Sequence, residues 1–244
     1  MNRVFITGDK HRNFDSVEDF CRRMETDEQD LMIVLGDNGV NYFGGTSDRR
    51  YKKYLNEFPI TFMMIRGNHD RRPDMELYHR YHCCTNTVCG DFLVEEEFPN
   101  LLFAIDGETY MFPATGDKAF VIGGAYSIDK FYRLESGNLW FPDEQLDEKE
   151  RAEIGKKFDE FASCGMEEDG YRYVFSHTCP KQFVPNEAKL SVPAWMEDPT
   201  MENWMGELYD NHGKDITRWF CGHWHICKED GNVRFMYEDF WRIV

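Results

Sequence analysis

Five short polar segments, each directly after an apolar run of strand-like composition, constrain the fold of this chain more than any other feature. Each segment places Asp, Asn or His where its run ends. They are Gly8-Asp9-Lys10-His11, Gly36-Asp37-Asn38, Gly67-Asn68-His69-Asp70, Ser176-His177 and Gly222-His223-Trp224-His225. In open α/β sheets, ligand-binding residues collect at the carboxyl ends of the strands. We therefore expect a fold that brings five strand ends to one place.

Strand-like runs alternate with amphipathic helical stretches early in the chain, a pattern typical of βαβ units. We predict strands at 3–7, 31–35, 60–65, 92–94, 101–105, 109–112, 119–122, 171–175 and 217–221, with hairpin turns at Asp106-Gly107 and Asp230-Gly231. We predict helices at 16–25, 48–57, 143–163 (ending at Gly165) and 201–209, and a short helix from Pro73. The sequence predicts an α/β fold in which two mixed β-sheets pack as a sandwich with flanking helices.

The 244 residues contain no repeat, low-complexity tract or linker, so we expect one domain over residues 1–244. Lys plus Arg number 28 and Asp plus Glu 45, which gives a formal net charge of −17. This charge disfavours extended nucleic acid or a membrane as partner, but it allows a small phosphorylated substrate in a locally positive pocket.

Every apolar run is far below the roughly 20 residues of a membrane span. With no export signal visible, we expect a cytoplasmic protein. The oligomeric state stays open.

Eight cysteines without an export signal favour free thiols in a reducing compartment over a disulfide framework. His82, Cys83, Cys84 and Cys89 form the one cluster that could hold zinc. Adjacent cysteines rarely reach the same ion, and no second Cys-x-x-Cys pair completes a site. The sequence therefore favours no structural zinc there.

The five polar segments carry donor atoms suited to cations. Asp9 and His11 lie two residues apart, so in extended backbone both side chains face the same side and can hold one ion. His223 and His225 have the same spacing. Asp37 has two oxygens and can bridge two cations, while a neutral amide oxygen is available at Asn68. Such donors suit Mn²⁺, Fe and Zn²⁺. Two divalent cations would outweigh the two carboxylates and attract a phosphate oxyanion.

Each segment alone has a simpler explanation. An Asp after a strand is often a turn residue or an N-cap, and a single His is often a surface or core residue. The five segments together, in this order and at predicted strand ends, favour a metal centre.

The same segments resemble the calcineurin-like metallophosphoesterase superfamily. Its pattern is Asp-x-His, Gly-Asp, Gly-Asn-His-(Asp/Glu), a lone His and Gly-His-x-His, and all five blocks occur between residues 8 and 225. The resemblance implies a four-layer α/β/β/α fold and a dinuclear, metal-dependent hydrolase of phosphomonoesters or phosphodiesters. It implies attack in line by a hydroxide that bridges two divalent transition-metal ions, with Mn²⁺ expected and Fe, Zn²⁺ or Ni²⁺ as alternatives.

The resemblance also implies roles for individual residues. Asp37 would bridge the cations, His69 would protonate the leaving oxygen or stabilise charge on the phosphoryl group, and Asp70 would orient His69. One cation would lie on Asp9, His11 and His225, and the other on Asn68, His177 and His223.

The chain departs from one branch of that superfamily. Protein serine/threonine phosphatases carry Asp-Arg shortly after the second-block Asp, and the segment from Asp37 to Tyr42 has no Arg, which disfavours that activity. The stretches Gly123–Arg133 and Trp140–Gln145 resemble uncharacterised bacterial and phage metallophosphoesterases. The candidates for substrate contact are Arg12, Tyr126 and Arg133.

The sequence is consistent with three functions. A small-substrate phosphoesterase is the first hypothesis, and a nuclease or RNA-end phosphatase is the alternative, which the net charge disfavours. A non-catalytic metal-binding interaction scaffold is the third. The long segment Pro180–Met205 lies between two of the polar segments and is expected near the mouth of the site.

Overall fold

The computed structural model describes residues 2–164, 170–188 and 192–243. The described strands are β1 (Val4–Thr7), β2 (Leu31–Val34), β3 (Thr61–Met64), β4 (His79–Cys84), β5 (Cys89–Val94), β6 (Leu101–Ala104), β7 (Thr109–Phe112), β8 (Asp117–Ile122), β9 (Arg172–Ser176), β10 (Arg218–Cys221), β11 (Lys228–Asp230), β12 (Val233–Phe235) and β13 (Trp241–Arg242). The described helices are α1 (Asp15–Met24), α2 (Gly45–Asn56), α3 (Lys130–Ser136), α4 (Glu148–Ser163) and α5 (Thr200–His212). The α/β class is confirmed.

The strands form one continuous curled sheet in the order β11-β12-β10-β9-β8-β7-β5-β6-β3-β2-β1-β13, with β4 added on β5. One half is parallel through β1, β2, β3 and β6, and the other is parallel through β8, β9, β10 and β12. Antiparallel pairs between β5, β6, β7 and β8 join the halves. We expected two mixed sheets packed as a sandwich. The structure joins them edge to edge into one sheet, because the β-rich middle of the chain hydrogen-bonds the two halves together.

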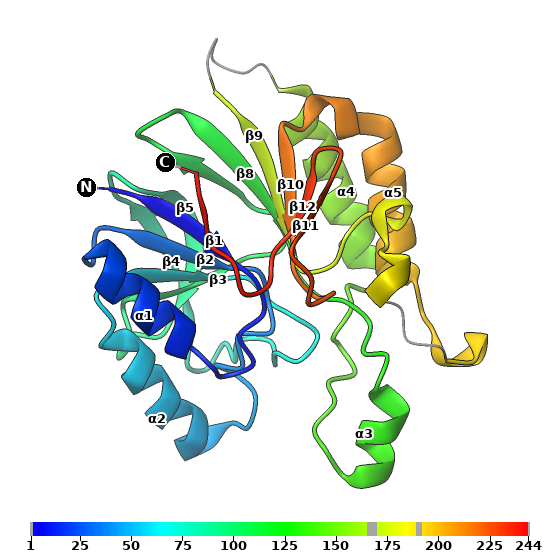
Figure 1. The fold of residues 1–244 in the computed structure, drawn as a ribbon, viewed down its shortest axis with the longest axis horizontal. Helices are drawn as coiled ribbons and strands as arrows, with labels where there is room; N and C mark the ends of the chain where they lie inside the picture. Colours follow the sequence, from blue (N-terminus) through cyan, green and yellow to red (C-terminus); the bar gives the residue numbers. More distant parts are fainter. Residues whose placement is uncertain (1, 165–169, 189–191, 244) are drawn as a thin grey trace.

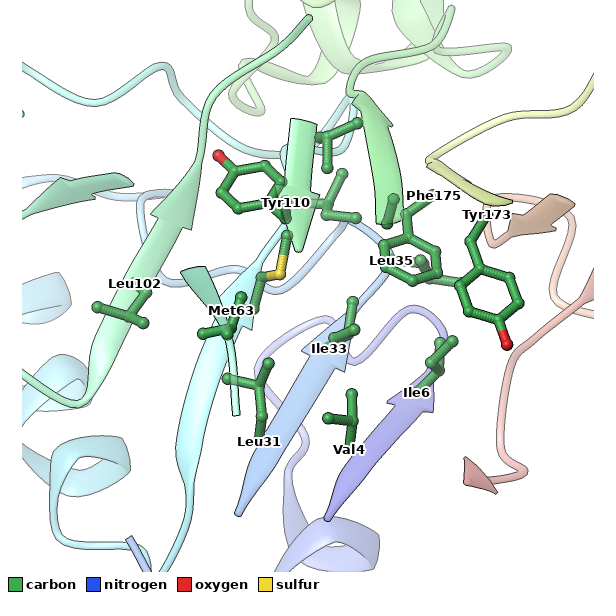
Figure 2. Close-up of a cluster of buried hydrophobic side chains, with 14 of the residues drawn as sticks. Val4, Ile6, Leu31, Ile33, Leu35, Met63, Leu102, Tyr110, Tyr173 and Phe175 are labelled. Atoms are coloured by element: carbon green, nitrogen blue, oxygen red, sulfur yellow. The ribbon is translucent and has the colours of Figure 1, made fainter. Parts of the chain in front are cut away.

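The two halves of the sheet face each other across a buried apolar core. Because successive side chains of a strand point to opposite faces, Ile6 and Ile33 point into this core while Phe5 and Met32 point away from it. Figure 2 shows the inward set, in which side chains of β1–β3 meet Tyr173 and Phe175 of β9 and Tyr110 of the joining strand β7. The packing is therefore that of a sandwich.

Helices cover the two outer faces. Phe20 of α1 packs edge-on against Phe5 at 4.9 Å between ring centroids, and Phe158 of α4 packs on Phe120 at 5.3 Å. Figure 1 shows α1 and α2 on one side of the sheet and α4 and α5 on the other. The resulting order of layers is α/β/β/α.

Two helix predictions differ most from the structure. The helix expected from Asp143 begins at Glu148, because Asp147 and Glu150 form a reciprocal capping box there. Its expected stop, Gly165, lies outside the described residues. No helix starts at Pro73: Asp74 organises a turn, and the chain then enters β4.

The parallel strands point their carboxyl ends toward one edge of the molecule. We call it the catalytic edge, because the polar segments expected from the sequence to hold cations and to act in catalysis follow these strands. Figure 1 shows α3 on an arm that extends from the body of the molecule. No described helix has the length and apolar character needed to cross a membrane.

Candidate metal centre

The fold brings all five polar segments to the catalytic edge. Asp9, Asp37 and Asn68 follow β1, β2 and β3 from one half of the sheet. His177 follows β9 and His223 follows β10 from the other half. Residues more than 200 positions apart meet here, since the backbone N–H of His223 donates to both carboxylate oxygens of Asp9 at 3.0 and 2.9 Å.

Asp9, His11 and His225 form a first group of donor atoms. Their ligand atoms all lie within 4.8 Å of one another. The Nε2 atoms of His11 and His225 face each other at 3.0 Å. These are three of the residues expected to hold one cation.

Asn68, His177 and His223 form a second group. The Asn68 Oδ1 atom lies 2.8 Å from His177 Nε2 and 3.1 Å from His223 Nδ1. Both histidines are therefore turned toward the same amide oxygen.

Asp37 lies between the two groups. Its Oδ2 is 3.7 Å from His11 Nε2, and its Oδ1 is 3.4 Å from His177 Nε2. Each carboxylate oxygen thus faces a different group, the arrangement needed for one side chain to contact two cations.

The donor set fits a cation on chemical grounds. His177 Nδ1 lies 2.7 Å from the Leu35 carbonyl oxygen, a contact that places a proton on Nδ1. The Nε2 atom points at the Asn68 and Asp37 oxygens, which are themselves acceptors, so an unprotonated Nε2 would direct its lone pair at them. Only a proton or a metal cation between these atoms makes the contact favourable. Oxygen and imidazole nitrogen donors are those that divalent transition-metal ions prefer.

The backbone around the donors is strained. Six non-glycine residues of the described chain have positive φ, and five of them are His11, Arg12, Asp37, His223 and His225. The left-handed conformation costs an ordinary residue roughly 1–2 kcal/mol. Such strain collects where a fold holds functional side chains in fixed positions.

Two glycines keep the donor groups close. A Cβ on Gly36 would lie 2.1 Å from His177 Nδ1, and a Cβ on Gly67 would lie 2.0 Å from Asp37 Oδ1. Glycine is therefore needed at both positions, because another site residue packs against its Cα.

Burial and charge shift the protonation of these groups. Burial raises the pKa of the Asp9 carboxyl to about 7. Burial opposes ionisation of Asp37 too, but His177 and His69 hold its pKa well below the usual range. Burial would lower the pKa of His177, yet Asp37 outweighs it and the pKa rises to about 9. Burial is the first cause of a lowered pKa in three further imidazoles, those of His11, His223 and His225.

Ser127 and Glu144 orient Asn68. Neither residue is among the site residues predicted from the sequence. The Asn68 amide nitrogen donates to Ser127 Oγ at 2.9 Å, and Ser127 Oγ donates to Glu144 Oε2 at 2.5 Å. These contacts turn the Asn68 oxygen toward the histidines. Ser127 lies in the stretch Gly123–Arg133 singled out in the sequence, but nothing in the pattern marks its hydroxyl.

His69 and Arg133 lie together beside the donor groups. Arg133 Nη2 is 3.3 Å from His69 Nε2, and the same guanidinium donates to Tyr42 Oη at 2.9 Å. His69 Nε2 is 3.9 Å from Asp37 Oδ2. Burial, with Arg133 adding to it, lowers the pKa of His69. The α3 arm therefore reaches back to the catalytic edge through Arg133.

Asp70 does not orient His69 in this structure. Within the described chain its carboxylate accepts hydrogen bonds from Asn38, from Gly39 N at 2.8 Å and from Gly67 N at 2.9 Å. Burial raises its pKa to about 6. Since its oxygens are occupied by these loops, Asp70 holds the Asp37 and Asn68 segments together instead.

The other two candidates for substrate contact differ from Arg133. Arg12 donates to Asp48 Oδ1 at 2.7 Å and to Gly39 O at 3.0 Å, and its guanidinium lies 4.2 Å from the Tyr51 ring centroid. These contacts fasten the first loop to α2, and a substrate contact by Arg12 stays a prediction. Tyr126 is half-buried, with Lys130 Nζ 5.8 Å from its ring centroid.

The segment from Pro180 to Met205 approaches the α3 arm. Trp195 is 70% exposed, and its ring centroid lies 5.2 Å from that of Phe131 on α3. Residues 189–191 of this segment lie outside the described residues.

Comparisons with known proteins place this geometry in a family. Residues 2–227 match the model of the calcineurin-like phosphoesterases. One similar solved structure has 11% sequence identity and a TM-score of 0.50, covering 96% of this chain and 89% of that one. Another, described provisionally as a 5′-nucleotidase from Staphylococcus aureus in complex with alpha-ketoglutarate, has 12% identity and a TM-score of 0.48. It is matched over 98% of this chain and 50% of its own length. No curated protein matches significantly.

The family match covers nearly the whole chain and contains every donor residue of the catalytic edge. The chain belongs to the calcineurin-like phosphoesterase family and is a metal-dependent phosphoester hydrolase.

Proposed function

We propose that this protein uses two divalent cations to hydrolyse phosphomonoester or phosphodiester bonds of small substrates. One observation carries the proposal: Asp37 directs one carboxylate oxygen toward each of two groups of donor atoms. A single cation needs only one such group, whereas two cations a few ångströms apart can act on both the attacking and the leaving oxygen of an in-line displacement.

The donor groups define the proposed ligand sets. Asp37 would contact both cations. The first would be held by Asp9, His11 and His225, and the second by Asn68, His177 and His223. When bound, the cations would supply Lewis-acid charge that activates water and stabilises phosphoryl oxygens.

His69 and Arg133 are the proposed phosphoryl contacts. Arg133 carries a permanent positive charge, since a guanidinium stays protonated in proteins. Its position 3.3 Å from His69 Nε2 puts charge where a phosphoryl oxygen would approach the Asp37 side of the site. His69 would donate a hydrogen bond or a proton to the leaving oxygen.

The activity is tested with protein stripped of metal and then supplied with Mn²⁺, Ni²⁺, Zn²⁺ or Mg²⁺. Aryl monoesters, aryl diesters, nucleotides, cyclic nucleotides and short single-stranded RNA form the substrate panel. We expect turnover of small phosphoesters that requires added cation. Turnover confined to RNA would favour the nuclease hypothesis, and two bound cations without any turnover would favour the scaffold.

Asp37→Asn tests the shared ligand. The neutral amide offers one oxygen in place of two, so we expect the metal content to fall from two equivalents to one or fewer. Turnover should fall about 1,000-fold or more, because metal ions contribute several kcal/mol to such barriers. Metal analysis and initial rates measure both effects.

Asp19→Asn, at an exposed position on α1, is the matched control and should retain the metal content and the turnover of the parent. Two equivalents of metal in Asp37→Asn would contradict the bridging role.

His69→Ala separates chemistry from metal binding. We expect kcat to fall about 100-fold through the loss of a proton donor, with two equivalents of metal still bound. His79→Ala, at an exposed position of β4, should match the parent. A His69→Ala variant as fast as the parent would exclude His69 from the reaction.

A further inference from the structure

A second cluster of potential metal ligands lies on the β4–β5 hairpin. Strand alternation separates the adjacent cysteines: Cys83 is buried in the core, and Cys84 is exposed on the opposite face. In the antiparallel register Cys84 pairs with Cys89, and His82 pairs with Asp91. All four side chains therefore stand on one face of the hairpin.

The three ligand atoms of this cluster are close together. The sulfur atoms of Cys84 and Cys89 are 2.7 Å apart, and Cys89 Sγ is 4.0 Å from His82 Nε2. The ligand atoms of His82, Cys84 and Cys89 all lie within 4.8 Å of one another. The objection raised by adjacent cysteines therefore does not apply, because Cys83 is not part of the group.

Asp91 prepares His82 for metal binding. Its Oδ1 lies 2.6 Å from His82 Nδ1, and its other oxygen accepts from Arg80 Nε at 2.8 Å. A carboxylate on Nδ1 places the proton there and leaves the Nε2 lone pair directed toward the sulfur atoms. Metal-binding histidines nearly always have such a carboxylate or carbonyl partner on the second nitrogen.

The neighbouring strand offers a further soft ligand. Met111 of β7 pairs directly with Cys89 of β5, and partners directly opposite in a sheet share a face. The Met111 side chain is partly exposed there. Thiolate, thioether and imidazole donors together select soft cations.

The cluster is separate from the catalytic edge. Thr87, in the hairpin turn, donates from Oγ1 to Gln29 O at 2.6 Å, and Gln29 lies just before the amino end of β2. The donors of the catalytic edge follow the carboxyl ends of the parallel strands. The two sets therefore lie at opposite ends of β2.

We propose that His82, Cys84 and Cys89 form a binding site for a thiolate-preferring cation, Zn²⁺ or a similar soft ion, with Met111 available as fourth ligand. Two thiolates and one imidazole are a ligand set that zinc accepts, and a fourth position completes the tetrahedron. The thiols lose their protons to solvent when the cation binds.

Cobalt(II) tests this site on the full chain kept reduced with a phosphine. Sulfur-to-cobalt charge transfer absorbs in the near ultraviolet, and the catalytic edge has only oxygen and nitrogen donors, so that band reports the hairpin alone. We expect the band in the parent, displacement by one equivalent of Zn²⁺, and loss of the band in Cys84→Ser and Cys89→Ser. Asp91→Asn should keep the band but weaken cobalt affinity about 10- to 100-fold.

Two variants serve as controls. Cys164→Ser removes an exposed thiol elsewhere, and Cys227→Ser removes the exposed thiol near His225; both should retain the band. Phosphoester turnover in Cys84→Ser should stay within twofold of the parent, which shows that this variant is folded. Absence of the band in the reduced parent, or its persistence in Cys84→Ser/Cys89→Ser, would overturn the proposal. A parent that forms a Cys84–Cys89 disulfide in air but shows no cobalt band after reduction would overturn it as well.

Discussion

The catalytic edge and the hairpin cluster gather metal-ligand side chains in opposite ways. At the catalytic edge the donors come from five loops, and left-handed backbone at residues such as Asp37 and His223 aims them inward. On the hairpin, His82, Cys84 and Cys89 are neighbours through regular strand register alone. The first set is buried for the most part, and the second is largely exposed.

This difference implies two kinds of metal site. Buried donors held by strained loops keep their positions without a ligand, so the protein bears the cost of their arrangement when it folds. Exposed side chains on a regular hairpin keep their rotamer freedom, so a cation must order them when it binds. Substitutions that disturb backbone packing should therefore damage the catalytic edge far more than the hairpin.

Gly36→Ala should have the largest effect. The added Cβ would lie 2.1 Å from His177 Nδ1 at a position with φ +92°, so His177 must leave both the Leu35 carbonyl and the second donor group. We expect turnover to fall about 1,000-fold or more, together with loss of metal, because several kcal/mol of Lewis-acid stabilisation depend on that group. Initial rates and metal analysis measure the effect.

Gly137→Ala is the matched control. Gly137 also has positive φ, at +71°, but a Cβ there meets nothing within 4 Å. Both variants should lose roughly 1–2 kcal/mol of stability from the backbone conformation, and only Gly36→Ala should lose metal. Equal metal contents in the two variants would show that close packing of Gly36 does not maintain the site.

Arg133→Gln tests whether the α3 arm belongs to the catalytic edge. The guanidinium touches His69 Nε2 but none of the proposed metal ligands. We expect kcat to fall about 100-fold, the size of effect seen when one charge-stabilising donor is removed, with both cations retained. Arg133→Lys should recover part of the rate. Unchanged kcat would limit Arg133 to a structural contact with Tyr42 and Asp129.

The donors of the catalytic edge could be predicted from the sequence because their positions follow from local rules. A polar residue after a buried parallel strand lies at the carboxyl edge of the sheet whatever the details of the fold. Asp9, Asp37 and Asn68 satisfy this rule on one half of the sheet, and His177 and His223 satisfy it on the other. The layer order likewise follows from strand alternation in residues such as Phe5 and Ile6.

Side-chain partners could not be predicted in this way. The family resemblance implies that Asp70 orients His69, yet the Asp70 carboxylate accepts hydrogen bonds from the backbone of Gly39 and Gly67. Arg12 directly follows the donor residue His11 in the sequence, but its guanidinium donates a hydrogen bond to Asp48 on α2. These outcomes depend on long-range packing, as does the joining of two sheets into one through β5 and β7.

Asp30→Asn probes the end of the sheet that carries the hairpin. Arg3 Nη2 lies 2.5 Å from Asp30 Oδ2, and Arg3 N donates to Oδ1 at 2.9 Å. Burial alone would raise the pKa of Asp30, but these contacts lower it. A lowered carboxyl pKa gives stability that is present above the unfolded value of about 4 and is lost as pH falls through the folded value.

We expect Asp30→Asn to lower the free energy of unfolding at pH 7 by roughly 1–3 kcal/mol, and the difference from the parent to shrink below about pH 4. Denaturant unfolding at several pH values measures this. At pH 7 the metal content of the catalytic edge should stay unchanged, since its donors lie at the opposite end of β1 and β2. A difference that is constant with pH would show that the carboxylate charge is not responsible.

Ser127→Ala should have the smallest effect, and it distinguishes the binding of one proposed cation from the binding of the other. The Ser127 hydroxyl accepts from Asn68 Nδ2 at 2.9 Å and donates to Glu144, so its removal frees the Asn68 amide to turn. Asn68 faces only the second donor group, because its oxygen contacts His177 and His223. Loss of such an orienting contact typically weakens metal binding by about 10-fold, so one of two binding steps in a calorimetric titration should weaken while the other stays unchanged. Ser127→Thr keeps the hydroxyl and should restore both steps. Equal weakening of both steps would mean that Ser127 supports the whole catalytic edge rather than the orientation of one ligand.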